Sequence, residues 1–239
     1  MLWYADVPST NDLAASMVER GAPEGRAVIA NGQSAGRGRR GRSWVSPAGA
    51  GLYVSVVLRP PERALPLLTI AAGVAVAEGI QAATGFIADL KWPNDVYAHG
   101  RKVAGVLAEA SSSNVAGAIQ QVVVGAGINV LPAAYPPDVA GRATSLESEL
   151  GRPVDRGTVL AEYLCHLAAR YEDLKCGRVD AITGAWRARA AVMLGRRVQW
   201  DTGGVTREGI AAGIDESGAL VVHTTGGSIR VTAGEVRWV

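Results

Sequence analysis

The residues best suited to chemistry are concentrated in one short segment, residues 36–44, with the sequence GRGRRGRSW. Four arginines and three glycines occupy seven consecutive positions there, between apolar runs at 27–30 and 52–58. Glycine lets a backbone approach a ligand closely and take positive φ. A guanidinium group binds a phosphate or a carboxylate through two parallel hydrogen bonds. The segment is therefore typical of a loop between two strands that wraps around an anion.

Two other interpretations of this arginine loop were weighed. Gly36, Gly38 and Gly41 satisfy the spacing G-x-G-x-x-G of dinucleotide-binding folds, but that motif opens a helix and has small residues between its glycines. Arginines and the following Trp-Val-Ser-Pro do not fit, so a Rossmann fold is excluded. A nucleic-acid-binding patch fits the loop by itself about as well as a ligand loop does. The net charge of only +2 over 239 residues weakens that alternative.

A second group of polar residues follows in the sequence KWPND at 91–95. Pro93 cannot donate to a sheet, so a strand is expected to end near Trp92, with Asn94 and Asp95 in a turn, which is also ordinary turn chemistry. The next apolar run begins at Lys102 after a glycine turn. A hairpin would place Asp95 and Lys102 near the same end of the sheet. Lysine is otherwise scarce, with three residues against 21 arginines.

Small and polar residues mark three further places. Ser9, Thr10 and Asn11 form a helix-capping cluster, and residues at a helix start can also present polar groups to a ligand. A predicted strand at 120–129 contains two glycines and ends at Asn129, and Gly105 lies inside another strand. These glycines either relieve packing or clear room for a flat ligand. The residues alone leave both alternatives open.

The remaining pattern predicts the elements that would position these groups. Helices are expected at 67–83, 159–174 and 181–190, and short alternating runs after residue 195 predict a small β-barrel. We therefore expect domains at 1–192 and 193–239. The two cysteines, Cys165 and Cys176, have no metal-binding spacing. No signal peptide and no apolar run of membrane-spanning length is recognised, which predicts a cytoplasmic protein without a membrane partner.

Taken together and in order, these motifs resemble the biotin–protein ligases of the BirA type. The resemblance implies an α+β fold: a mixed β-sheet flanked by helices, like that of class II synthetases, followed by an SH3-like barrel. Some family members carry a DNA-binding helix-turn-helix before the catalytic domain. Ser9-Thr10-Asn11 come too early in this sequence for such a module, so we expect a ligase without DNA as a partner. Lipoate–protein ligases are the sister alternative, and the arginine loop favours biotin.

The resemblance implies that biotin and ATP form biotinyl-5′-AMP with Mg²⁺, and that biotin then passes to a lysine of a biotin carboxyl carrier domain of acyl-CoA carboxylase. It also assigns site residues. The catalytic residues are Lys102, Arg37 and Asp95. The biotin-binding residues are Ser9, Thr10, Gln33, Gly36, Arg37, Lys102 and Gly105. The ATP-binding residues are Arg39, Arg42, Trp44, Asn94, Asp95, Lys102 and Asn129. The metal ligands stay unknown. Residues 36–43 are expected to be mobile without ligand and ordered with it.

Overall fold

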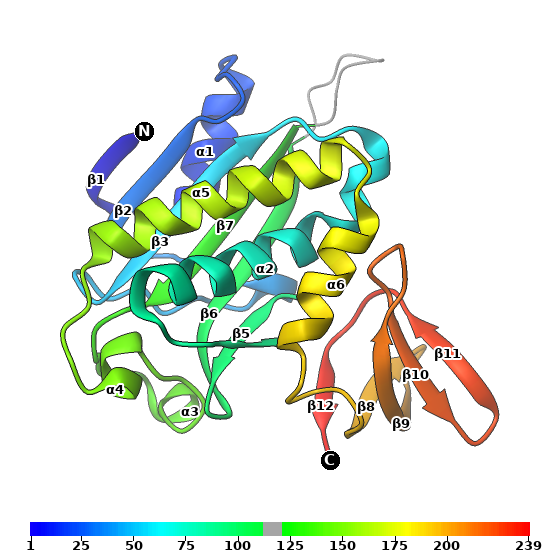
Figure 1. Ribbon diagram of the computed structural model, residues 1–239. Coiled ribbons are helices and arrows are strands. Elements are labelled where there is room, and N and C mark those ends of the chain that lie inside the picture. The colour runs from blue at the N-terminus through cyan, green and yellow to red at the C-terminus, as the bar shows by residue number, and fades with distance from the viewer. Residues whose placement is uncertain (112–120) are drawn as a thin grey trace.

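A computed structural model describes residues 1–111 and 121–239 and contains two sheets (Figure 1). The larger sheet has seven strands in the order β1-β2-β3-β7-β6-β5-β4. Its strands are β1 (Leu2–Val7), β2 (Ala27–Gln33), β3 (Gly51–Leu58), β4 (Asp89–Lys91), β5 (Asp95–Ala98), β6 (Arg101–Ser111) and β7 (Gln121–Asn129). β1 pairs with β2 in parallel, and the other neighbours are antiparallel. The predicted mixed sheet is confirmed.

Helices cover both faces of this sheet. α2 (Leu65–Thr84) and α5 (Arg156–Lys175) pack on one face, and α1 (Thr10–Glu19) lies on the other (Figure 1). All eight residues of β3 are buried, as expected for a central strand covered on both sides. Alternate side chains of β3 serve the two layers: Val56 belongs to the core beneath α2, and Val57 to the core beneath α1.

α2 is built largely from small and aliphatic residues, which lets α5 approach it closely. A Cβ at Gly79 would lie 2.7 Å from the backbone of Tyr163 on α5, so only glycine fits there. By length and hydropathy the segment Glu62–Thr84 could also cross a membrane, contrary to the expectation that no run is long enough. However, 72% of its apolar window is buried inside the protein, which is the environment of a core helix.

The chain continues through two short helices, α3 (Pro137–Ala140) and α4 (Leu146–Leu150), and through α6 (Val179–Arg189) into the second sheet. This sheet is antiparallel with strand order β11-β10-β9-β8-β12. Its strands are β8 (Arg197–Thr202), β9 (Val205–Ile214), β10 (Leu220–Thr224), β11 (Gly227–Val231) and β12 (Val236–Trp238). It packs against the part of the chain that forms the larger sheet, where the indole of Trp92 donates to the carbonyl of Gly218 at 2.8 Å.

Candidate active site

A cavity of about 710 Å³ opens where the arginine loop, the start of α1, β6, β7 and the end of the C-terminal sheet meet. Every site residue predicted from the sequence lines it except Gly36. Gly36 lies behind the wall, where a Cβ would be 2.4 Å from the carbonyl oxygen of Trp44. Among residues 1–111 and 121–239, the lining contains eight lysine and arginine side chains but only two carboxylates, those of Asp95 and Glu235. The cavity is therefore built for anions.

One corner of the cavity is a network of neutral hydrogen bonds at the start of α1. Ser9 caps the helix. Gln33 Oε1 accepts from the backbone N–H of Thr10 at 2.8 Å, and Gln33 Nε2 donates to Ser46 Oγ at 2.8 Å. Ser55, buried on β3, lies 2.8 Å from Thr10 Oγ1. The capping cluster therefore starts the helix and also lines the cavity.

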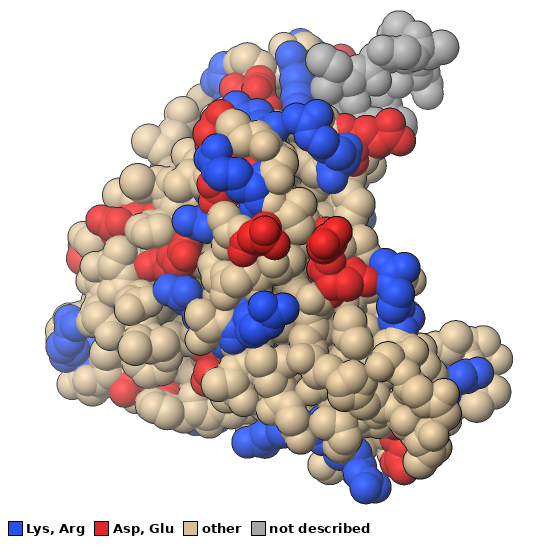
Figure 2. Space-filling view, turned by 45° about the vertical axis from the view of Figure 1, so that its right-hand side comes forward, with Lys and Arg blue, Asp and Glu red and all other residues tan. Residues whose placement is uncertain are grey.

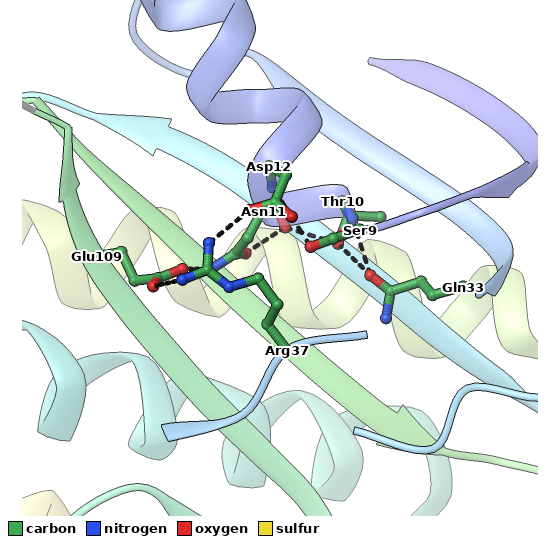
Figure 3. A network of polar contacts seen from close by, with 8 residues as sticks. Ser9, Thr10, Asn11, Asp12, Gln33, Arg37 and Glu109 are labelled. Carbon is green, nitrogen blue, oxygen red and sulfur yellow. Dashed lines mark hydrogen bonds and ion pairs between the residues drawn. The ribbon is translucent and has the colours of Figure 1, made fainter. Parts of the chain in front are cut away.

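Arg37 leaves the loop at this corner and points toward two carboxylates (Figure 3). Its guanidinium donates to Asp12 Oδ1 at 2.5 Å and to Glu109 Oε1 at 2.6 Å. The hydrogen bond that Arg37 donates to Asp12 is the main cause of the raised pKa of Arg37. Asn11 Nδ2 donates to the other oxygen of Glu109 at 2.9 Å. One arginine therefore joins α1, the loop and β6. Its two carboxylate partners were not predicted from the sequence.

The floor of the cavity is made by glycines on adjacent strands. Gly105 of β6 pairs with Gly127 of β7, and the ring of Trp44 rests on both. A Cβ at Gly127 would lie 2.4 Å from Trp44 Nε1, and one at Gly105 would lie 3.2 Å from Trp44 Cζ3. At Gly125 a Cβ would lie 2.1 Å from Asn11 Oδ1. The glycines therefore leave space for specific side chains, and at two of them the occupant is a flat aromatic ring.

The predicted hairpin brings Asp95 and Lys102 together. Lys102 Nζ lies 2.5 Å from Asp95 Oδ1 and 5.0 Å from the centroid of the Trp44 ring. Asn94 beside them donates through Nδ2 to the carbonyl of Val106 at 2.8 Å. Its Oδ1 accepts from Arg39 Nη1 at 3.2 Å. The KWPND turn is thereby fixed to β6 and contacts the loop.

Burial also shapes the environment of two further predicted site residues, Arg39 and Asn129. Desolvation is the main cause of a lowered pKa of Arg39, so its charge is expensive to hold without an anion nearby. Asn129, which is almost fully buried, donates through Nδ2 to the carbonyl of Thr144 at 3.0 Å. Asn129 also lines the cavity.

The C-terminal sheet supplies one wall of the cavity. Lys91 Nζ lies 4.4 Å from the ring centroid of Trp238 and 5.4 Å from that of Tyr97, and burial lowers its pKa. Arg42 of the loop forms a bidentate ion pair with Glu235. Lys91 therefore forms an aromatic contact between the two sheets. Glu235 carried no signal in the sequence.

Residues 1–111 and 121–239 contain no cluster of three His, Cys, Asp or Glu side chains that could bind a metal ion without other ligands. Of the two carboxylates that line the cavity, Asp95 is paired with Lys102 and Glu235 with Arg42.

Comparison with known proteins agrees with this geometry. The profile of the biotin/lipoate A/B protein ligase family matches residues 3–129, and that of the biotin protein ligase C-terminal domain matches residues 193–237. A biotin–[acetyl-CoA-carboxylase] ligase of Paracoccus denitrificans is 41% identical, with 87% of this chain and 88% of that protein covered. One of Mycobacterium tuberculosis is 36% identical, with 97% and 86% covered.

Among solved structures, the biotin protein ligase from Aquifex aeolicus in complex with biotin and ATP is 30% identical. It superimposes with a TM-score of 0.88, covering 100% of this chain and 98% of that one. The match extends over both sheets, and the family profile covers more than half of the sequence. The chain belongs to the biotin protein ligase family.

Proposed function

We propose that this biotin protein ligase catalyses an adenylyl transfer followed by an acyl transfer. In the first, a carboxylate oxygen of biotin attacks the α-phosphorus of ATP, pyrophosphate leaves, and biotinyl-5′-AMP forms. In the second, the amine of a carrier lysine attacks the acyl carbon of the adenylate, AMP leaves, and an amide forms. The observation that carries the proposal is the cavity in which eight cationic side chains surround a glycine floor and a neutral polar corner.

The excess of positive charge in the cavity would offset the repulsion between the two anions that react in the first step. A carboxylate and a triphosphate repel each other, and charge builds up on the α-phosphate as the new bond forms. Fixed cations aimed at that charge lower the barrier. Lys102 and Arg37 would neutralise the biotin carboxylate and the α-phosphate, and Arg39 and Arg42 would hold the rest of the triphosphate. Their positions around one cavity support these roles.

The neutral corner suits the other end of biotin. A ureido group has two N–H donors and one carbonyl acceptor and carries no charge, so it needs hydroxyls and amides rather than ions. Ser9, Thr10 and Gln33 offer these groups beside the cavity, held in place by Ser46 and by the helix start. Trp44 on the floor of Gly105 and Gly127 would bring an apolar ring against the bound ligand.

Magnesium is proposed as the companion of ATP rather than as an ion held by the protein. Mg²⁺ keeps several waters and is usually bound through one or two carboxylates and substrate phosphates. The described lining offers two carboxylates, each already paired with a cation, which fits an ion carried by the phosphates. When bound, it would neutralise phosphate charge. Asp95, beside Lys102, would receive the proton of the attacking carrier amine, directly or through water.

The acceptor is proposed to be the biotin carboxyl carrier domain of an acyl-CoA carboxylase. Support comes from the two relatives whose names specify an acetyl-CoA carboxylase as the substrate. The matched control is the same carrier domain with its acceptor lysine replaced by arginine. Biotin should be incorporated into the first and not into the second. Equal incorporation into both would contradict a carrier-specific transfer.

The first half-reaction is tested by ATP–pyrophosphate exchange with biotin, with lipoate in place of biotin, and with neither acid. Exchange that requires biotin supports the proposal. Exchange driven by lipoate would move the protein to the lipoate–protein ligases, which share the broader family profile. Absence of exchange with either acid would contradict the activation step.

Nucleic-acid binding through the arginine loop finds little support. Positive and negative side chains are interspersed on the face seen in Figure 2, whereas nucleic-acid-binding surfaces concentrate positive charge. Arg37 and Arg42 in the loop are also neutralised by carboxylates of the same chain.

A further inference from the structure

A contact between the C-terminal sheet and the arginine loop carries an inference about how ATP gains access to Arg42. Glu235 lies in the turn before β12 and accepts from Arg42 through both carboxylate oxygens, one of them 3.0 Å from Nη1. The turn also approaches the neighbouring loop residue, since a Cβ at Gly234 would lie 3.9 Å from Arg40 Nη2. Glu235 and Arg42 both line the cavity.

The C-terminal sheet is also docked by contacts other than this ion pair. That sheet is held from its other side, where Trp92 donates to the carbonyl of Gly218 and a Cβ at Gly218 would lie 3.1 Å from Leu67 Cδ2. The pair itself is partly solvated: 63% of the Arg42 side chain and 35% of the Glu235 side chain are exposed. An ion pair of this exposure contributes little to stability. Its place in the cavity calls for another explanation.

The charge and the geometry of the Arg42–Glu235 pair explain why it lies in the cavity. The bidentate face of a guanidinium accommodates one planar or tetrahedral anion at a time. Glu235 occupies that face of Arg42, so a phosphate that takes it must first displace the carboxylate. Glu235 is one of two carboxylates among eight cations in the lining, and the other, Asp95, is paired with Lys102. Glu235 thus imitates an anion at the triphosphate end of the cavity.

We infer that Glu235 is a positioning residue that competes with the phosphates of ATP for Arg42. It holds the loop against the C-terminal sheet until nucleotide arrives, and nucleotide binding exchanges that contact for a phosphate contact. The inference rests on the proposed function, in which Arg42 holds the triphosphate. The Glu235–Arg42 ion pair must break before a phosphate can bind Arg42. The apparent affinity for ATP is therefore the intrinsic affinity multiplied by the fraction of molecules in which this ion pair is open.

The test compares Glu235→Gln, which keeps the shape and removes the charge, with the wild type. Glu208→Gln is the matched control: Glu208 pairs with Arg197 at 3.6 Å within the same sheet, and neither residue lines the cavity. In biotin-dependent exchange, Glu235→Gln should lower KM for ATP by about two- to fivefold, the range expected for a partly exposed ion pair. KM for biotin and the magnesium requirement should not change, and Glu208→Gln should match the wild type.

Two measurements that do not depend on catalysis accompany the kinetics. Calorimetric titration with ATP should show the same two- to fivefold tightening in Glu235→Gln. Limited trypsin cleavage without nucleotide should cut this variant after loop arginines faster than it cuts Glu208→Gln. An unchanged or weaker ATP affinity would overturn the inference, as would an increased magnesium requirement, which would make Glu235 a metal ligand. Loss of exchange in the wild type would refute the proposed function, while the titration would still decide the role of Glu235.

Discussion

Replacing Lys102 by alanine tests the electrostatic basis of the proposed chemistry most directly. The ammonium group lies 2.5 Å from Asp95 Oδ1 and 5.0 Å from the Trp44 ring, at the point where the glycine floor meets the KWPND turn. Its side chain is 28% exposed, so water screens it only in part. A fixed cation in that position can stabilise charge that develops on an α-phosphate, because it does not need to reorganise during the reaction.

The structure separates the expected loss of rate from the expected loss of stability. Removal of one preorganised electrostatic group costs about 10²- to 10³-fold in rate. The ion pair with Asp95 is partly exposed, so its loss should lower the free energy of unfolding by about 1 kcal/mol or less. The cation–π contact with Trp44 adds roughly 0.5–1 kcal/mol. The variant should therefore fold, and its main defect should be slow adenylate formation.

The assay is single-turnover formation of biotinyl-5′-AMP, run beside thermal unfolding. Lys102→Arg keeps a charge but spreads it over a planar group, and it should recover part of the rate. Lys175→Ala is the control, since Lys175 is an exposed lysine that pairs with Glu172 on its own helix and does not line the described cavity. Adenylate formation by Lys102→Ala within threefold of the wild type would refute the assignment. So would a rate loss fully explained by unfolding.

Three further changes test other parts of the site. Arg39→Gly should loosen the hold on the adenylate, so that biotin appears on bystander proteins detected by blotting; a label confined to the carrier would contradict this. Gly127→Ala would put a Cβ 2.4 Å from Trp44 Nε1, and overpacking of about 1–3 kcal/mol should raise KM for biotin and ATP several-fold. Burial opposes the lowered pKa of Glu149, but a hydrogen bond from Thr144 and nearby cations outweigh it. The stability from its charge is therefore present above the unfolded pKa and lost as pH falls through the lower folded pKa. In thermal unfolding Glu149→Gln should be less stable than the wild type at pH 7, and the difference should disappear once the pH is below the folded pKa of Glu149.

Local sequence patterns predicted much of the architecture because the deciding interactions are local. The helix expected at 67–83 is α2, and the short runs after residue 195 are the strands of the C-terminal sheet. The juxtaposition of Asp95 and Lys102 followed from one proline and one glycine turn, which specify a hairpin without knowledge of the rest of the chain. The first strand, β1, was not predicted from the sequence; of its six residues only Val7 is buried, so it lacks the run of core side chains that marks the central strands.

The partners of the loop arginines could not be predicted in this way. Glu109 lies 72 residues from Arg37, and Glu235 lies 193 residues from Arg42. Asp12 is close to the capping cluster, where its type is ordinary for a helix start. Nothing in the sequence marks these carboxylates, because what brings them to the cavity is the strand order and the docking of the C-terminal sheet.

The glycines of the loop explain how one short segment can reach every side of the cavity. Arg40 and Gly41 both take left-handed backbone conformations, with φ of 57° and 72°, and this turn separates Arg39 from Arg42. Arg39 is thereby directed to the KWPND turn and Arg42 to the C-terminal sheet. After the turn the chain returns Trp44 to the floor. Arginine is a costly residue at positive φ, so the turn directs Arg39 and Arg42 to different partners at the expense of local strain.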